Sequence, residues 1–280
     1  MSSEAESRFH MVDVSQITSR PVQDMLRTDL RTDDGVRIEA VYEPSTASVT
    51  DPAAGTAVVV AHGFTGSADR PALRRAVAAF RDRASVVSFS FRGHGGSGGR
   101  STVGDREVLD LSAAVRWARE LGHARVVTVG FSMGGSVVLR HAAVERDAAA
   151  RADAVAAVSA PARWYYRGTP SMRRVHWVVT RPLGRVVGRV GLGTRIHNRD
   201  WDPVPLSPVE AVPLIAPTPL LIVHGDRDPY FPVDHPRMLA AAAERAGAPA
   251  ELWLERGMGH AENAADDELL GRLGNWLARP

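Results

Sequence analysis

The stretch Arg125 to Gly135 reads RVVTVGFSMGG, and its second half has the pattern Gly-x-Ser-x-Gly centred on Ser132. The residues before Ser132 are β-branched and apolar, as in a strand buried on both faces, and the residues after it have a helical pattern. A serine on so sharp a strand-to-helix turn takes a strained backbone that lifts its hydroxyl above the sheet. The stretch therefore predicts a nucleophile elbow with Ser132 as the nucleophile.

The same alternation of strand and helix extends on both sides of this stretch. Apolar or alternating runs predict strands at 36–42, in a hairpin with the segment before it, and at 56–61, 85–91, 125–131, 154–159, 219–224 and 250–255. Helical patterns lie between them at 71–80, 105–120, 133–145, 234–246 and 266–278. This order predicts a mostly parallel α/β sheet with helices on both faces and functional groups at the C-terminal strand ends.

One region interrupts the alternation. Between residues 159 and 219 no buried strand is predicted, while Pro, Gly, Arg and large aromatic residues recur. We therefore expect residues 161–205 to form a cap insertion, residues 33–160 and 206–280 to form the α/β core, and residues 1–32 to form an N-terminal extension.

Composition excludes several chemistries. The chain of 280 residues has no Cys and no Lys, so all 34 basic residues are arginines. Disulfides, thiolate metal sites, Walker phosphate loops and Schiff-base lysines are therefore unavailable. The net charge of +2 does not indicate a nucleic-acid partner. No apolar run is long enough to span a membrane and the first twenty residues do not form a signal peptide, so we expect a cytoplasmic protein.

A serine nucleophile needs a base and an orienting carboxylate. His260 lies in the loop Arg256 to His260 directly after the last predicted strand, from which its imidazole can reach back over the sheet. Asp226 and Asp228 both follow the preceding strand. We assign Asp228 as the acid, since it lies farther into the loop, and expect Asp226 to stabilise the turn.

An oxyanion requires backbone donors close to the nucleophile. Gly63 follows a strand and allows close approach of the main chain, so the N–H groups of Phe64 and Met133 are the expected donors. His62, Arg92 and His94 are expected to make structural bonds around this site, and His123 and His141 are expected at the surface.

Five segments together resemble a known family: HGFTGS, FRGHGGSGG, GFSMGG, HGDRDPYFP and GMGHAE. They occur in the order found in α/β-hydrolases of the monoacylglycerol-lipase and serine-aminopeptidase-like group. The resemblance implies an α/β-hydrolase fold with an eight-stranded, mostly parallel sheet, its second strand antiparallel, and a small helical cap. It also implies Ser132, Asp228 and His260 as a catalytic triad, and Phe64 and Met133 as oxyanion donors.

The expected activity is hydrolysis of a small-molecule carboxylic ester or related acyl substrate, without a metal or organic cofactor. Thioester or amide hydrolysis and acyl transfer use the same triad, and a non-catalytic ligand-binding scaffold is the alternative of another class. The cap adds a question of partners, because residues 161–199 hold nine arginines and no acid. Either Arg181, Arg185 and Arg189 face water while a valine face packs on the core, or the cap meets an anionic membrane surface or acidic substrate.

Overall fold

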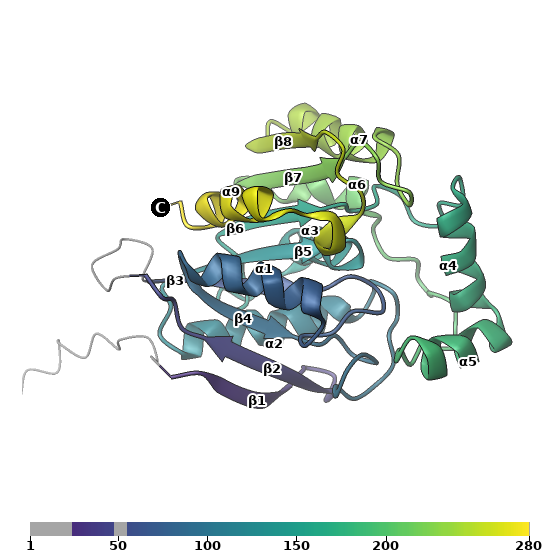
Figure 1. The fold of residues 1–280 in the computed structure, drawn as a ribbon, viewed down its shortest axis with the longest axis horizontal. Coiled ribbons are helices and arrows are strands. Elements are labelled where there is room, and N and C mark those ends of the chain that lie inside the picture. The colour runs from purple at the N-terminus through teal and green to yellow at the C-terminus, as the bar shows by residue number, and fades with distance from the viewer. Residues whose placement is uncertain (1–23, 48–54, 280) are drawn as a thin grey trace, which may run out of the picture.

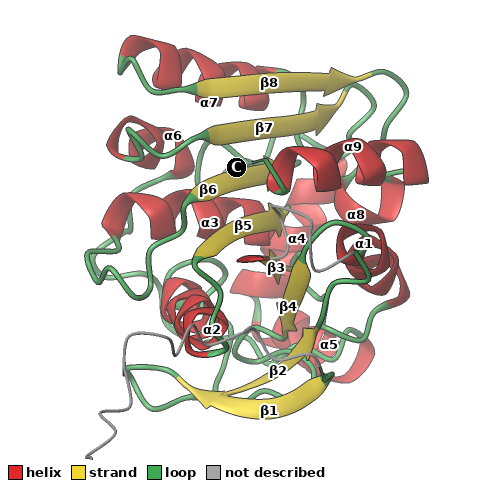
Figure 2. Cartoon of the chain, turned by 90° about the vertical axis from the view of Figure 1, so that its left-hand side faces the viewer, coloured by secondary structure: helices red, strands yellow, loops and turns green. Residues whose placement is uncertain are grey.

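The computed structural model describes residues 24–47 and 55–279 and contains one eight-stranded sheet, shown in Figures 1 and 2. The strand order is β1-β2-β4-β3-β5-β6-β7-β8. Only β1 with β2 and β2 with β4 pair antiparallel, and the other pairs are parallel. The strands are β1 (Leu26–Arg31), β2 (Arg37–Glu43), β3 (Thr56–Ala61), β4 (Ser85–Phe89), β5 (Arg125–Phe131), β6 (Ala154–Val158), β7 (Leu220–Gly225) and β8 (Ala250–Glu255). The predicted fold is confirmed.

Helices cover both faces of this sheet (Figure 2). Helices α2, α3 and α7 share one apolar cluster with the sheet, and α1, α8 and α9 share the other. The helices are α1 (Pro71–Arg81), α2 (Glu107–Glu120), α3 (Met133–Val144), α4 (Pro170–Thr180), α5 (Pro182–Gly191), α6 (Pro208–Ala211), the 3-10 helix η3 (Val212–Leu214), α7 (Asp234–Arg245), α8 (Ala261–Ala264) and α9 (Asp267–Leu277). No helix in the described part of the chain is long and apolar enough to cross a bilayer.

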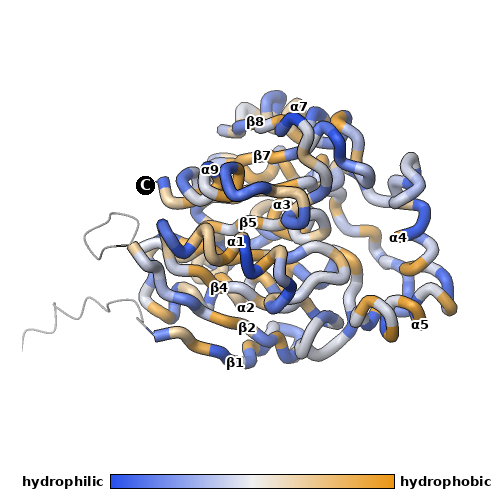
Figure 3. The backbone as a smooth tube through the Cα atoms, viewed as in Figure 1, coloured by the Kyte–Doolittle hydropathy of each residue, from blue (hydrophilic) through white to orange (hydrophobic). Residues whose placement is uncertain are grey.

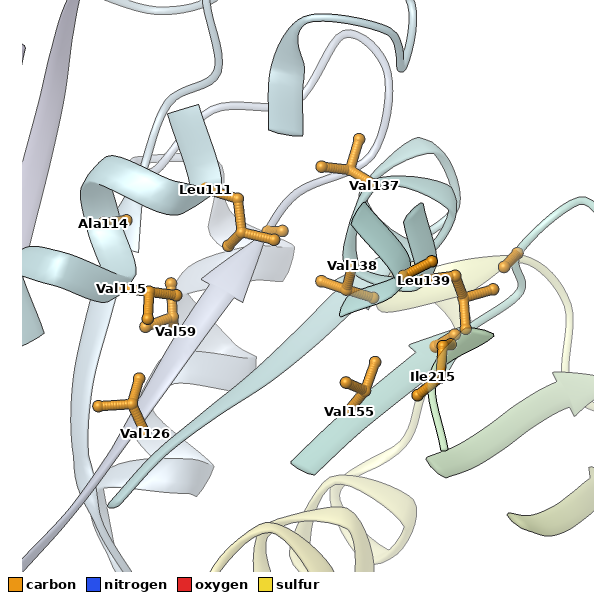
Figure 4. Close-up of a cluster of buried hydrophobic side chains, with 14 of the residues drawn as sticks. Val59, Leu111, Ala114, Val115, Val126, Val137, Val138, Leu139, Val155 and Ile215 are labelled. Carbon is orange, nitrogen blue, oxygen red and sulfur yellow. The ribbon is translucent and has the colours of Figure 1, made fainter. Parts of the chain in front are cut away.

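The central strands are apolar because both of their faces are buried. Every residue of β3 and β4 is buried, as is every residue of β6 and β7. Figure 4 shows one side of this core, a cluster that includes Val59 and Val126 of the sheet, Leu111 of α2 and Val138 of α3. The continuous β-branched runs that predicted the parallel strands reflect this two-sided burial.

The sheet begins earlier in the chain than residue 33. Strand β1 lies within the segment 1–32 that was expected as an extension, and it forms the predicted hairpin with β2. Its sequence LRTDLR is mostly exposed, which suits an edge strand and explains why no buried pattern marked it. The rest of that segment, residues 1–23, lies outside the described residues.

Two histidines that were expected at the surface are buried. His123 is 2% exposed and His141 is 1% exposed. His123 Nε2 lies 3.1 Å from the Tyr42 hydroxyl, while His141 lies on α3, a helix packed between the sheet, α2 and η3. The prediction for His141 was wrong because α3 is buried nearly all round, so its helical periodicity does not mark an outer face. The prediction for His123 was wrong because this loop residue packs against Tyr42 of β2.

The cap segment 161–205 contains α4 and α5, which pack on each other beyond the C-terminal ends of the strands (Figure 1). The expectation that a valine face of the cap packs on the core was wrong. Val186, Val187 and Val190 are exposed, and the residues of α5 that are buried are Gly184 and Gly188.

Burial of His141 makes stability depend on pH. Burial lowers the pKa of His141 to about 4. Between pH 6.5 and that value, the imidazole is therefore protonated in the unfolded chain but neutral in the native state. We expect the free energy of unfolding to fall by about 1.4 kcal/mol for each pH unit of acidification in this range through this one group. Urea unfolding between pH 7.5 and 5 should show that His141→Leu removes this part of the slope. Parallel curves for the variant and the native protein would contradict the assignment.

Candidate active site

The turn from β5 to α3 holds Ser132 in a strained conformation. Ser132 has φ 53° and ψ −112°, a backbone region that costs about 1–3 kcal/mol for a non-glycine residue. The strain follows from the close approach of strand and helix. A Cβ at Gly130 would lie 2.1 Å from the Gly134 carbonyl oxygen, and one at Gly134 would lie 2.3 Å from the Ala61 carbonyl oxygen. Glycine is therefore required at both positions.

The structure brings Ser132, His260 and Asp228 together from three separate loops. His260 Nε2 lies 2.8 Å from Ser132 Oγ, and His260 Nδ1 lies 2.7 Å from Asp228 Oδ2. The loops follow β5, β7 and β8, whose parallel C-terminal ends lie at one edge of the sheet. The arrangement is a hydrogen-bonded chain from hydroxyl to imidazole to carboxylate.

The carboxylate of Asp228 is held as an anion that faces His260. Its side chain is fully buried, and the N–H groups of Tyr230 and Phe231 donate to Oδ1 at 2.8 and 3.1 Å. Burial alone would raise its pKa, but the hydrogen bond with His260 and the two amides outweigh burial and lower it. The other candidate, Asp226, is exposed and accepts a hydrogen bond from the Gly257 N–H at 2.6 Å. Asp226 therefore links the loop after β7 to the loop after β8, rather than bonding amides of its own turn as expected.

Aromatic rings and a buried serine fix the position of His260. The ring of Tyr230 lies 4.3 Å from the imidazole, centroid to centroid, and that of Phe231 lies 5.7 Å away. The next amide, that of Ala261, donates to Ser159 Oγ at 3.0 Å. Sequence reasoning missed Tyr230 and Ser159. The available signals were that Ser159 directly follows β6 and that Tyr230 lies two residues after Asp228.

The loop after β3 lies against the nucleophile. A Cβ at Gly63 would lie 3.4 Å from Ser132 Cβ, so the main chain passes directly beside the serine. The Phe64 N–H follows in this loop, and the Met133 N–H opens α3, where first-turn amides have no partner within the helix. Both amides thus lie next to Ser132, and their role as oxyanion donors stays a prediction.

Two neutral histidines brace this loop, as expected. His62 donates from Nδ1 to the Gly63 carbonyl at 2.7 Å and accepts from the Phe91 N–H at 3.0 Å. Burial, with the neighbouring His94, lowers the pKa of His62 to about 3, so the ring stays uncharged. His94 Nε2 accepts from the Thr65 N–H at 3.3 Å. Since both nitrogens of His62 are occupied by main-chain groups, it is unsuited to act as the base.

Glu262 is a buried carboxyl that sequence reasoning did not single out. It is 7% exposed, its Oε1 lies 3.5 Å from the Gly63 nitrogen, and Oε2 makes no hydrogen bond to any described residue. Burial raises its pKa. The residue borders a hollow of about 660 Å³ beside the Gly63 loop, lined also by Phe64, Arg70 and Arg75. Its position two residues after His260 was the available signal.

Comparison with known proteins agrees with this architecture. The family model described as alpha/beta hydrolase fold matches residues 56–171. The Pyrococcus furiosus esterase Pf2001 is 22% identical, with 98% of each chain covered and a TM-score of 0.69. The esterase domain of a Rhodothermus marinus protein is 21% identical, covering 91% of this chain and 96% of its own, with a TM-score of 0.61.

A third structure, XC6422 from Xanthomonas campestris, is described as an α/β serine hydrolase without lid. It is 19% identical, with 92% and 93% of the chains covered and a TM-score of 0.58. No curated protein matches the sequence significantly. The chain therefore has the α/β-hydrolase fold, while the narrower resemblance to the monoacylglycerol-lipase and serine-aminopeptidase-like group stays a hypothesis.

The glycine requirement at the elbow can be tested directly. Gly130→Ala should lower the melting temperature and abolish any Ser132-dependent activity, because its Cβ would overlap the Gly134 carbonyl. The matched control is Gly271→Ala in α9, where an added Cβ meets nothing within 4 Å. That change should stabilise the protein by about 0.5–1 kcal/mol. Equal melting temperatures for the two variants would refute the steric argument.

Proposed function

We propose that this protein is a serine hydrolase that cleaves carboxylic esters through an acyl-Ser132 intermediate. The observation that carries the proposal is the 2.8 Å contact between Ser132 Oγ and His260 Nε2, with Asp228 on the other ring nitrogen. The fold supports it, since two of the structures that this chain resembles are described as esterases. The ordered chain of hydrogen bonds is what a serine needs in order to become a nucleophile.

Acylation begins when Ser132 Oγ attacks the ester carbonyl and His260 Nε2 accepts its proton. Asp228 stabilises the imidazolium and holds the ring so that Nε2 faces the serine. The negative charge that develops on the carbonyl oxygen lies between the N–H groups of Phe64 and Met133. Each such donor contributes about 3–4 kcal/mol of transition-state stabilisation. Collapse of the tetrahedral intermediate expels the alcohol, which takes the proton from His260.

Deacylation repeats these steps with water in place of the serine hydroxyl. His260 removes a proton from water, the hydroxide attacks the acyl carbon, and Ser132 leaves with the proton returned from His260. An alcohol or amine that replaced water would make the enzyme an acyltransferase, and a thioester or amide would be cleaved by the same groups. Esters are favoured here because the structural resemblances include esterases.

A non-catalytic binding scaffold is the alternative of another class. It would retain the fold without using the hydroxyl of Ser132. The hydrogen-bonded order of Ser132, His260 and Asp228 disfavours this alternative, because a binding scaffold has no need of a carboxylate that orients an imidazole toward the serine hydroxyl.

The proposal predicts covalent labelling of one residue. A fluorophosphonate probe should label the native protein at Ser132, with mass spectrometry locating the adduct. Ser132→Ala should lose the label and lower kcat/KM for p-nitrophenyl esters by about 10³-fold or more, with an unchanged circular dichroism spectrum. A native protein that resists the probe would support the binding scaffold instead.

The two aspartates of one loop provide a matched pair. Asp228→Asn should lower kcat by about 10³- to 10⁴-fold, because the amide no longer stabilises the imidazolium or selects its tautomer. Asp226→Asn, two residues away and exposed, should retain activity within a few-fold. Steady-state kinetics on the same p-nitrophenyl ester measure both. Comparable losses in the two variants would remove Asp228 from its assigned role.

A further inference from the structure

The outer face of α5 is apolar and uncovered. Leu183 is 66% exposed, Val186 56%, Val187 41% and Val190 82%. These four residues recur at helical spacing and form one stripe, called here the α5 apolar face. Figure 3 shows apolar segments along α5 at the edge of the molecule, away from the sheet. A contiguous apolar face on a soluble domain usually marks an interaction site.

Glycines fix the direction in which this face points. Gly184 and Gly188 lie on the buried side of α5. A Cβ at Gly184 would lie 2.3 Å from the Trp177 carbonyl oxygen of α4, and one at Gly188 would lie 3.0 Å from Ile196 Cδ1. Because only glycine fits against the α4 backbone at position 184, α5 cannot rotate to bury its larger side chains there. The fold itself therefore holds the apolar face outward.

The cap that carries the α5 apolar face also carries arginines without a carboxylate partner among the residues that the structure describes. Residues 161–199 contain nine arginines and no Asp or Glu. Within residues 24–47 and 55–279, Arg163 is the one cap arginine with a carboxylate in salt-bridge range, that of Asp234 at 3.0 Å. Arg181 and Arg189 of the α5 segment are exposed, as are Arg173 and Arg174 of α4. The cap thus combines apolar contact area with charge that lacks a counterpart in the described chain.

Helix α4 adds a concave feature to the same cap. A shallow hollow of about 540 Å³ is lined by Pro170, Arg173, Arg174, Trp177 and Val178. Trp177 is 44% exposed. Tryptophan is enriched where apolar and aqueous phases meet, and paired arginines bind phosphate oxygens. The lining therefore suits a phosphate-bearing headgroup with apolar surface beside it.

From these features we propose that the α5 apolar face and the exposed cap arginines dock the protein on an anionic lipid surface. Apolar side chains would enter the acyl boundary, while the arginine stems extend along it and keep their guanidinium groups among the phosphates. A second copy of the chain fits less well, since a two-fold interface through this face would place arginines opposite arginines. The proposal goes beyond ester hydrolysis and does not depend on it.

The location of the cap connects this surface with the candidate active site. The cap lies beyond the C-terminal strand ends (Figure 1), at the sheet edge that carries Ser132 and His260. Docking through α5 would therefore hold that edge of the protein close to the lipid. An ester that partitions into the bilayer would be concentrated near the entrance to the site.

Flotation of the full-length protein with vesicles tests the proposal. The native protein should bind phosphatidylcholine vesicles that contain phosphatidylserine, bind phosphatidylcholine alone weakly, and release from the mixed vesicles as salt is raised. The exposed double change Arg181→Gln/Arg189→Gln should weaken binding by about tenfold or more, since each arginine near such a surface contributes about fivefold. Val186→Asp/Val190→Asp should weaken it at least as much.

Matched controls separate docking from general effects on charge and folding. Val144→Asp/Leu254→Asp changes two exposed apolar residues outside the cap and should leave vesicle binding unchanged. Hydrolysis of a soluble p-nitrophenyl ester should be unchanged in the cap variants, so loss of docking is read independently of catalysis. Equal binding by native protein and cap variants would overturn the proposal. So would concentration-dependent dimers that Val186→Asp/Val190→Asp dissolves, or an effect of the arginine changes confined to soluble anionic esters.

Discussion

The close approach of β5 to α3 is the constraint on which the candidate site depends. With no side chain at Gly130, the helix begins against β5, and with none at Gly134 it also lies against the end of β3 at Ala61. Between these glycines Ser132 has φ 53°. That geometry raises the hydroxyl above the sheet and leaves the first amides of α3 directed at the same point. Because β5 lies in the middle of the sheet between β3 and β6, loops from both directions can reach the serine. The contacts of Gly63 and His260 with Ser132 follow from this central position.

A buried polar network supports the Gly63 loop from behind. His62 and His94 hold main-chain groups of the loops after β3 and β4, and Arg92 lies between Asp34 and Asp110 at salt-bridge distance. Burial keeps His62 neutral, so its ring presents one donor and one acceptor at fixed places. The Gly-rich segment after β4, residues 92–98, superficially resembles a phosphate loop. Its part here is structural, since His94 holds the Thr65 N–H of the candidate oxyanion loop.

Features coded locally were predictable from the sequence, and features set by tertiary contact were not. The buried strands, the elbow and the order Ser132, Asp228, His260 follow from residue patterns within a few positions of each other. The burial of His141 depends on what packs around α3, and the contact of Glu262 with the Gly63 nitrogen joins residues nearly 200 positions apart in the chain. The bounds of strand β1 and its place in the core were not predicted, because an exposed edge strand needs no apolar pattern.

In the cap, the sequence pattern predicted the wrong buried side of α5. A valine stripe on a helix ordinarily indicates the side that faces the core. In α5 the buried side is made of glycines, because the absence of a side chain at Gly184 lets the α5 and α4 backbones approach each other. The apolar stripe therefore lies on the opposite, exposed side of α5. Helix α4 has no fully buried residue, and those of α5 are Gly184 and Gly188. The large apolar side chains of α5 therefore add little to the stability of the isolated fold. Their apolar character is better explained by a surface that they meet outside the protein than by the core they were expected to join.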